Sequence, residues 1–252
     1  RNAKFLDEDD AKVTGFIDVA SKSNPMYEQN IRQLNTNSNL RASTTYASFL
    51  KSNSDPRIVN FFGSMSAGSL DQGDYLNPST TASAAAIFKE TPEDPVVFLS
   101  EAESFFLQAE ARERYFNGDG AKALYDQGVL AAFASVGQDG SSFIAAGGKY
   151  EYPSGTLDQN IEAIITQKWA SFPYGVHFIE GWFEKNRTGF PKTSPVYSTD
   201  PSYIPGEFVV SKNSVLPPGK LPKRFVFPDI ERSTNPNTPA EVPITTPVWW
   251  GK

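Results

Sequence analysis

The clearest hydrophobic pattern lies in the middle of the chain, over residues 94–189, and it predicts pairs of amphipathic helices. In the first of them, "DPVVFLSEAESFFLQAEARERYFNGDG", apolar residues recur at the spacing of one helical face. Asp94 is placed to cap this helix, Pro95 suits its first turn, and Asn117 with Gly118 ends it. The apolar ridge consists of Leu99, Ala102, Phe106 and Ala109.

A second helix follows after a very short turn, with Asp119 as its predicted cap and Gly137 at its end. Its inner face combines large and small side chains: Leu124, Tyr125, Gly128, Ala131 and Ala132. Small residues that face large ones allow two antiparallel helices to pack closely, as in the hairpins of tetratricopeptide repeats. The pattern therefore predicts a helical hairpin.

A second helical pair begins at Thr156, which is predicted to form a capping box with Gln159. The buried stripe of its first helix consists of Leu157, Ile161, Ile164, Ile165 and Phe172. Pro173 ends that helix, and the next helix is predicted to end at Gly189, before Pro191. The apolar face predicted for this last helix consists of Val176, Ile179, Trp182 and Phe183.

The flanking segments are less regular. Residues 1–90 are rich in Asn, Ser and Thr, and residues 52–83 are predicted to form a long surface excursion. One helical candidate in this part, which ends at Pro25, is formed by Val13, Phe16, Ile17 and Ala20. The Pro-rich residues 190–252 are predicted to wrap over the helical layer as loops with a strand or two. We therefore expect one domain over residues 1–252 that is mainly α-helical, with tetratricopeptide-like helical hairpins and long loops.

The composition narrows the functional classes. The 252 residues carry a formal charge of -6 without a dense Lys and Arg cluster, so nucleic acid is not a predicted partner. The absence of cysteine excludes disulfides, thiolate zinc sites and cysteine nucleophiles within this sequence. No apolar run approaches the roughly 20 residues that cross a bilayer. The opening "RNAKFLDEDD" does not resemble a signal peptide, which leaves a cytoplasmic protein or a processed fragment.

Candidate catalytic groups are few. His177 is the only histidine, and without a G-x-S-x-G elbow it is best explained as a packed or helix-surface residue. The pairs Glu101/Glu103 and Glu110/Glu113 resemble glycosidase carboxylates in type, but they are predicted to lie on the solvated side of their helix, with Glu110 paired to Arg114. We therefore assign no catalytic residue, no metal ligand and no cofactor.

Three stretches together resemble one family: "FLSEAESFFLQAEARERYFNGDGAKALYDQGVLAAF", "QKWASFPYGVHFIEGWFEKNRTGFP" and the ending "TTPVWW". In this order they are similar to the carboxyl-terminal portion of SusD/RagB-like nutrient-binding outer-membrane lipoproteins. The matching positions are Gln167, Lys168, Trp169, Glu180, Trp182, Arg187, Thr188, Gly189 and Pro191. Asn186 stands where the family usually has the first of two arginines. We interpret these matches as structural and assign none of them a ligand.

The resemblance implies a largely helical, non-enzymatic protein that is lipid-anchored on the extracellular face of the outer membrane. Such a protein binds oligosaccharides or polysaccharides and delivers them to a TonB-dependent SusC-like transporter. Family members are longer and carry a lipidated cysteine, so the resemblance also implies a truncated or processed chain. The alternative is a tetratricopeptide-like scaffold that presents a groove to a peptide or protein partner.

Sugars are held by aromatic faces together with amide, hydroxyl and carboxylate groups, which are often carried by loops. The loop-rich excursion supplies this chemistry, and the predicted ligand-binding residues are Phe62, Asp71, Tyr75 and Asn77. A glycoside hydrolase built on Asp71 and Asp74 is a weaker third hypothesis. The two tryptophans near the end of the chain, Trp249 and Trp250, are predicted to pack against the helical layer as a latch rather than to stack on a sugar.

Overall fold

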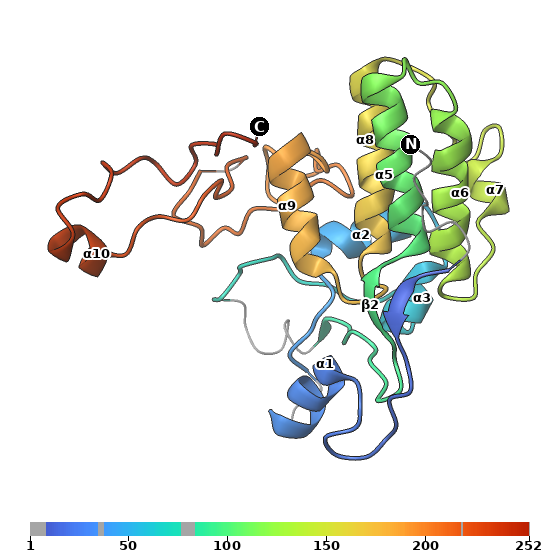
Figure 1. Cartoon of the computed structure of the whole chain (residues 1–252), viewed down its shortest axis with the longest axis horizontal. Helices are drawn as coiled ribbons and strands as arrows, with labels where there is room; N and C mark the ends of the chain where they lie inside the picture. Colours follow the sequence, from blue (N-terminus) through green and yellow to red (C-terminus); the bar gives the residue numbers. More distant parts are fainter. Residues whose placement is uncertain (1–8, 35–37, 77–83, 218, 252) are drawn as a thin grey trace, which may run out of the picture.

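The computed structural model describes residues 9–34, 38–76, 84–217 and 219–251, and the fold in these ranges is mainly helical (Figure 1). A long helical hairpin and a third helix beside it form the body of the molecule. The helices are α1 (Pro25–Tyr27), the π-helix η1 (Glu28–Gln33), α2 (Thr44–Ser52), α3 (Arg57–Phe62), α5 (Glu101–Tyr115), α6 (Ala121–Ala134), α7 (Ser141–Ile144), α8 (Leu157–Ser171), α9 (Phe178–Thr188) and α10 (Asp229–Thr234). No helix in the described ranges has the length and apolarity that a bilayer span requires.

The body is the layer formed by α5, α6 and α8, which lie side by side in Figure 1. Phe106 of α5 and Val129 and Phe133 of α6 are fully buried between these helices. Gly128 of α6 faces the ring of Phe106, which lets the two helices approach closely, so the predicted hairpin is confirmed. The predicted capping box of Thr156 and Gln159 at the start of α8 is also confirmed.

The starts of the first two helices differ from the prediction. Residues predicted as the first turn of the hairpin form strand β2 (Val96–Leu99), and α5 begins only after Ser100. The Ser100 hydroxyl accepts a hydrogen bond from the Glu103 amide, so Ser100, not Asp94, is the cap. Likewise, α6 is preceded by Gly120 in a left-handed conformation (φ 75°), and Asp119 is not its cap.

A short antiparallel sheet explains the first of these differences. Strand β1 (Ala11–Val13) pairs with β2, with Ala11 opposite Leu99 and Val13 opposite Val96. Val13 therefore belongs to a strand, and the helical candidate predicted before Pro25 is wrong. The alternation of apolar and polar residues around Val96 is short. Pairing with the distant strand β1 nevertheless satisfies the backbone hydrogen-bonding groups of this segment, and this overrides the helical periodicity.

The predicted surface excursion over residues 52–83 is only partly correct. Arg57 and Asp55 in its first part are completely buried and form an ion pair, with 2.6 Å between Arg57 Nη2 and Asp55 Oδ2. Tyr150 donates a hydrogen bond to the same carboxylate oxygen at 2.7 Å. This buried pair fixes α3 beneath the helical hairpin, and residues 63–76 of the segment form turns and loops.

The carboxyl-terminal residues form two segments, one that packs on the body and one that extends from it. Residues 191–211 pack on the body, where the amide of the buried Val209 donates to Thr45 Oγ1. Residues 212–217 and 219–251, which we call the arm, start and end beside α9, where the rings of Phe225 and Trp182 lie 5.9 Å apart, and extend outward to α10 near the far end (Figure 1). The two legs of the arm are tied together by hydrogen bonds, among them Lys223 N to Ile244 O at 2.8 Å. The prediction that the whole tail wraps over the helices is therefore wrong for the arm.

The predicted tryptophan latch is also wrong. The side chain of Trp249 is 96% exposed and that of Trp250 is 40% exposed. The legs of the arm bond to each other instead, since Arg224 donates to the carbonyl oxygens of Thr246 and Pro247. The segment before the tryptophans is thus ordered by the arm's own hydrogen bonds, whereas the backbone at Gly251 lies against the carbonyl oxygen of Asn186 on α9.

Candidate functional site

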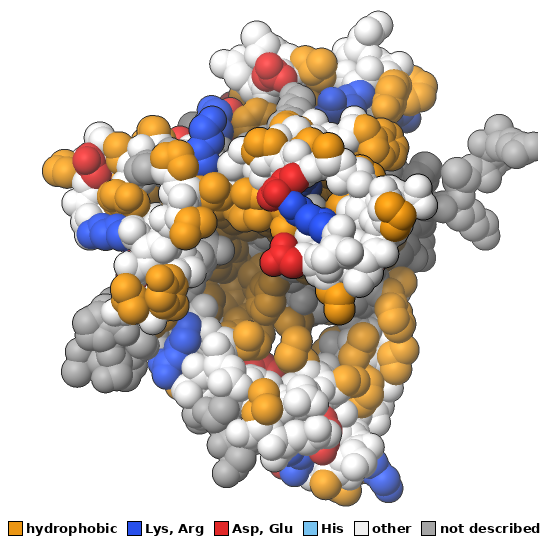
Figure 2. Space-filling model, turned by 90° about the vertical axis from the view of Figure 1, so that its left-hand side faces the viewer, with side chains coloured by type: hydrophobic (Ala, Val, Ile, Leu, Met, Phe, Trp, Pro, Cys, Tyr) orange, Lys and Arg blue, Asp and Glu red, His pale blue; other side chains and the backbone are white. Residues whose placement is uncertain are grey.

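A candidate site is a cavity of about 550 Å³ between α2, α8 and α9 and the loops before α2 and after α3. The space-filling view in Figure 2 shows a face that is hollowed in its middle, with hydrophobic side chains inside the hollow. Eight of the eighteen lining residues are aromatic: Tyr46, Phe62, Phe88, Trp169, Phe172, Phe178, Trp182 and Phe208. We call this space the aromatic cavity.

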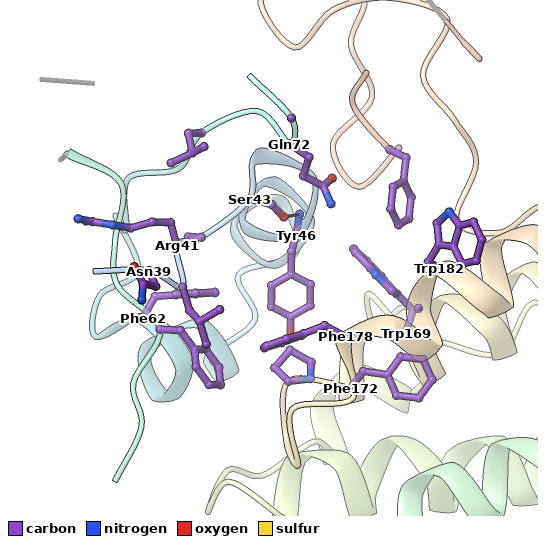
Figure 3. A pocket seen from close by; sticks show the side chains of 18 residues that line it. Asn39, Arg41, Ser43, Tyr46, Phe62, Gln72, Trp169, Phe172, Phe178 and Trp182 are labelled. Carbon is purple, nitrogen blue, oxygen red and sulfur yellow. Dashed lines mark hydrogen bonds between the residues drawn. The ribbon is translucent and has the colours of Figure 1, made fainter. Parts of the chain in front are cut away.

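Tyr46 stands in the centre of the aromatic cavity, and residues of α8 and α9 form the opposite wall (Figure 3). The ring of Tyr46 meets the ring of Trp169 edge-on, with 5.2 Å between the centroids. Its hydroxyl donates to the carbonyl oxygen of Ala170 at 2.8 Å, so the ring has a fixed orientation. Phe178 meets Phe88 edge-on at 5.4 Å and continues the same wall. Fixed rings of this kind offer flat apolar faces to a ligand.

Polar side chains line the other side of the aromatic cavity: Asn39, Arg41, Ser43 and Gln72. Arg41 donates to the carbonyl oxygens of Ser38 and Ala85, which holds two loops together. Ser43 caps α2, because its hydroxyl accepts a hydrogen bond from the Tyr46 amide. The cavity therefore combines an aromatic wall with a rim of amide, hydroxyl and guanidinium groups.

The wall formed by α9 differs from the predicted amphipathic pattern. The residues of α9 that are buried are Gly181, Lys185, Asn186 and Thr188, whereas Ile179 and Phe183 are exposed. Asn186, which stands in place of the family's arginine, donates to the carbonyl oxygen of Trp182 at 3.1 Å. The helix therefore turns its polar side toward the body, and Trp182 lines the cavity.

Buried charges explain this orientation of α9. Arg187 donates to both carboxylate oxygens of Glu110 on α5, at 2.7 Å each, and also to Glu184 at 2.6 Å. The predicted pair of Glu110 and Arg114 is confirmed at 2.6 Å. Burial by itself would raise the pKa of Glu110, but the two arginines outweigh it and hold that pKa below its usual value.

A second ion-pair cluster lies near the start of α9. Lys168 of α8 lies 3.4 Å from Glu103 of α5 and 3.3 Å from Glu184 of α9. His177, the residue before α9, has Nδ1 3.7 Å from Glu103 and Nε2 2.6 Å from the carbonyl oxygen of Val97. The neighbouring carboxylate of Glu103 raises the pKa of His177 above its usual value. These contacts confirm that the histidine is packed.

The acids Glu103 and Glu110 are both buried, so their predicted place on a solvated face is wrong. Each is paired with cations that come from α8 or α9, more than 50 residues further along the chain. The local helical pattern cannot show such partners. Their role in this structure is to fix α9, and thereby the aromatic wall, against the hairpin.

The structure brings only one of the four predicted ligand-binding residues into the aromatic cavity. Phe62 lines it, whereas Asp71 accepts a hydrogen bond from Ser198 at 2.6 Å and is not part of the lining. Tyr75 is 77% exposed and also lies outside the lining. Asn77 lies outside the described residues. As ligand-binding residues, the four stay predictions.

The sequence interpretation missed Trp169 and Trp182 as cavity residues. The family resemblance predicts both as structural residues; Trp169 is indeed buried in the core, and it lines the cavity as well. Within the described ranges, the lining of the aromatic cavity includes no Asp, Glu or His. In the same ranges, no group of three or more His, Asp or Glu side chains is placed to hold a metal ion.

Comparison with known proteins identifies the family of this chain. A family model for SusD-like proteins, described as starch-binding and associating with the outer membrane, matches residues 2–208. This chain belongs to the SusD-like family. The predicted family and the mainly helical fold are thereby confirmed. A search of curated protein sequences found no match.

Solved structures resemble this SusD-like chain over most of its length. A SusD homologue from Bacteroides uniformis is 23% identical, with a TM-score of 0.63 over 96% of this chain and 56% of that one. A chitin-binding SusD homologue from Flavobacterium johnsoniae is 24% identical, with a TM-score of 0.60 over 83% and 49% of the two chains. A homologue from Bacteroides fragilis is 18% identical, with a TM-score of 0.62 over 96% and 56%. The SusD-like chain thus spans about half of the length of these proteins, with which it shares the fold.

Proposed function

We propose that this chain binds oligosaccharides or longer glycans without transforming them, and that the aromatic cavity holds the sugar. The observation that carries the proposal is the wall of fixed rings around Tyr46, formed by Trp169, Phe178 and Trp182. Aromatic faces cover the apolar C–H surface of a sugar ring, and neighbouring amide and hydroxyl groups pair with its hydroxyl groups. The volume of about 550 Å³ lies within the range that is usual for ligand sites.

The chemistry of the lining favours binding over hydrolysis. Glycoside hydrolases use two carboxyl groups that flank the glycosidic bond, about 5–10 Å apart. Among the described residues, none of those that line the aromatic cavity carries a carboxyl group. Asp71 and Asp74, the acids of the hydrolase hypothesis, accept hydrogen bonds from Ser198 and Asn213 instead. We therefore propose a non-enzymatic role.

The family description supports a proposal for the cellular setting. The family description names starch binding and association with the outer membrane, and one relative of similar fold is described as chitin-binding. We propose that the protein acts on the extracellular face of the outer membrane, held there by a lipid anchor. In this setting it would deliver its glycan to a TonB-dependent SusC-like transporter.

One observation favours a second candidate function, that of a protein-interaction scaffold. The arm carries aromatic side chains that face solvent, among them Phe225, which is 88% exposed, and Trp249. Exposed aromatic residues are enriched where proteins bind partners. If the scaffold is the main function, loss of Phe225 will abolish capture of a purified protein partner while glycans fail to bind at all.

The glycan proposal is tested by calorimetric titration of the purified chain with maltoheptaose and with chitohexaose. Replacement of Trp182 by Ala removes one ring of the wall, and we expect the affinity for the bound glycan to fall by about tenfold or more. Tyr115→Ala is the matched control, because Tyr115 is an exposed aromatic residue at the end of α5 that lines no cavity described here.

Equal affinity of the wild type and a folded Trp182→Ala variant would contradict the placement of the sugar in the aromatic cavity. The same titration with Tyr75→Ala tests the loop prediction. Unchanged affinity in that variant would remove Tyr75 from the site. Release of reducing sugar by the wild type would contradict the non-enzymatic role.

A further inference from the structure

A second cavity, of about 370 Å³, lies next to the aromatic cavity, and the two share Phe88 and Pro173 as lining residues. We call it the Glu90 cavity. Its other walls come from the start of α1, the end of α3, the segment after α6 and the turn before α9. Unlike the aromatic cavity, it has acidic residues in its lining, Glu90 and Asp94, together with Lys89.

Glu90 has one carboxylate oxygen without a partner. Its Oε1 accepts a hydrogen bond from Asn30 Nδ2 at 2.5 Å, whereas its Oε2 is buried and has no hydrogen-bond partner among the described residues. Burial raises the pKa of Glu90. A buried acceptor without a donor is destabilising, so each such group in a native structure requires an explanation. Glu90 lines the cavity, so a ligand hydroxyl group that reaches its Oε2 would supply the missing bond.

The surroundings of Glu90 are held in place by hydrogen bonds of their own. Asn30 in η1 accepts from Asn39, a residue of the aromatic cavity, and donates to Glu90. Asn24 and Asn60, which line the Glu90 cavity, donate to the carbonyl oxygens of Asp94 and Val136. The site is therefore pre-formed, and its amides do not compete for the free oxygen of Glu90.

The unmatched groups define the class of ligand. Glu90 requires a hydrogen-bond donor, and Lys89 carries three N–H groups, of which one contacts the carbonyl oxygen of Val59 at 3.4 Å. Sugars and small polyols carry neighbouring hydroxyl groups that donate and accept at the same time. A purely apolar ligand would leave Glu90 unpaired, and an anion would meet the carboxylate lining of Glu90 and Asp94.

We propose that the Glu90 cavity is a second binding site, which takes one sugar ring or a small polyol whose hydroxyl groups donate to Glu90 and accept from Lys89. The rings of Phe61 and Phe88 are buried beside it and provide apolar surface for the C–H face of such a ligand. The choice of a sugar rests on the proposed function, whereas the cavity and its unpartnered oxygen do not depend on it.

The test is a titration of the ¹⁵N-labelled chain with glucose and with N-acetylglucosamine, followed in ¹H–¹⁵N correlation spectra. The Gly175 amide and the Asn60 side-chain amide report on the Glu90 cavity. The Gly181 amide and the Trp169 indole report on the aromatic cavity. We expect at least one of the two sugars to shift the signals of Gly175 and Asn60.

Glu90→Gln is the informative variant, because it keeps the shape of the side chain. Its amide oxygen can still accept from Asn30, so its NH₂ group takes the place of the free acceptor. We expect the dissociation constant read from Gly175 and Asn60 to rise by about tenfold or more. Glu93→Gln is the matched control, since Glu93 is exposed and lies outside both linings.

The outcomes separate this proposal from the proposed function. Shifts that stay confined to Gly181 and Trp169, or an unchanged dissociation constant in Glu90→Gln, would overturn the second site. Failure of the proposed function would instead appear as silent Gly181 and Trp169 signals with every oligosaccharide. If Glu90→Gln does not fold, Met26→Trp is the second variant, because the larger side chain narrows the Glu90 cavity. It must raise the dissociation constant read from Gly175 and Asn60 in the same way.

Discussion

The close approach of α5 and α6 depends on Gly128, and its replacement by Ala tests the packing of the hairpin. A Cβ atom at this position would lie 2.7 Å from Cε1 and 2.8 Å from Cδ1 of Phe106. Real Cβ atoms essentially never come this close to other heavy atoms, and the ring of Phe106 is fully buried, so it cannot move into solvent. The two helices or the ring must therefore shift.

Two effects of opposite sign decide the result. Ala is better than Gly in a helix by about 1 kcal/mol, which favours the variant. Overpacking of a tight core costs typically about 1–3 kcal/mol, which opposes it. Because the overlap is with rigid ring atoms rather than with the tip of a flexible side chain, we expect the steric cost to win. The free energy of unfolding of Gly128→Ala should therefore fall, by up to about 2 kcal/mol.

Urea unfolding followed by circular dichroism measures this change, with an m-value that should stay constant. The matched experiment is the double-mutant cycle with Phe106→Leu, which removes the ring that the new methyl group meets. We expect the double variant to be more stable than the sum of the single effects predicts, by about 1 kcal/mol. Stabilisation by Gly128→Ala, or strict additivity with Phe106→Leu, would refute the steric explanation.

Three further predictions concern the charges around α9. Glu110→Gln removes one carboxylate partner of Arg187, and the free energy of unfolding should fall by about 2 kcal/mol. This is less than for a fully buried pair, because Arg187 is partly exposed and keeps Glu184 as a second carboxylate partner. An unchanged free energy of unfolding in urea would contradict this. The raised pKa of His177 means that its pairing with Glu103 stabilises the protein below about pH 6.5 and is lost as the pH rises, so His177→Gln should lower Tm more at about pH 6 than at about pH 8.5. Burial lowers the pKa of Lys185 to about 7, so this lysine destabilises the fold at and below that pH and less as the pH rises toward 10. Lys185→Met should therefore raise the free energy of unfolding by roughly 1–3 kcal/mol near pH 7 and flatten its dependence on alkaline pH, and a drop in Tm at pH 7 would count against this.

The fold could be predicted best where the signal is local. The apolar spacing of α5, α6 and α8 is visible within each segment, and the capping box at Thr156 needs only four consecutive residues. The start of α5 was placed too early, because Val96 and its neighbours pair with a strand that lies more than 80 residues earlier in the chain. A helical pattern is identified within a short stretch of sequence. It cannot show that a distant strand will pair with the same backbone.

The candidate site could be predicted only in its chemistry. Loop position and residue type led to Phe62, which lines the aromatic cavity, and to three further residues that stay predictions. Trp169 and Trp182 belong to helices, and the family motif predicts them to be structural. Whether such a ring faces the core or a cavity depends on the helix that packs beside it.

The sequence by itself determined the family, the helical hairpin and the absence of cysteine chemistry in this chain, because each depends only on neighbouring residues or on composition. Only the tertiary structure decided which side of α9 faces the body, since Arg187 pairs with Glu110 only when residues 77 positions apart in the chain come together. It also decided that the arm projects and that two cavities share Phe88. Periodicity records which residues prefer burial, whereas the partner that buries them is fixed only by packing between distant segments.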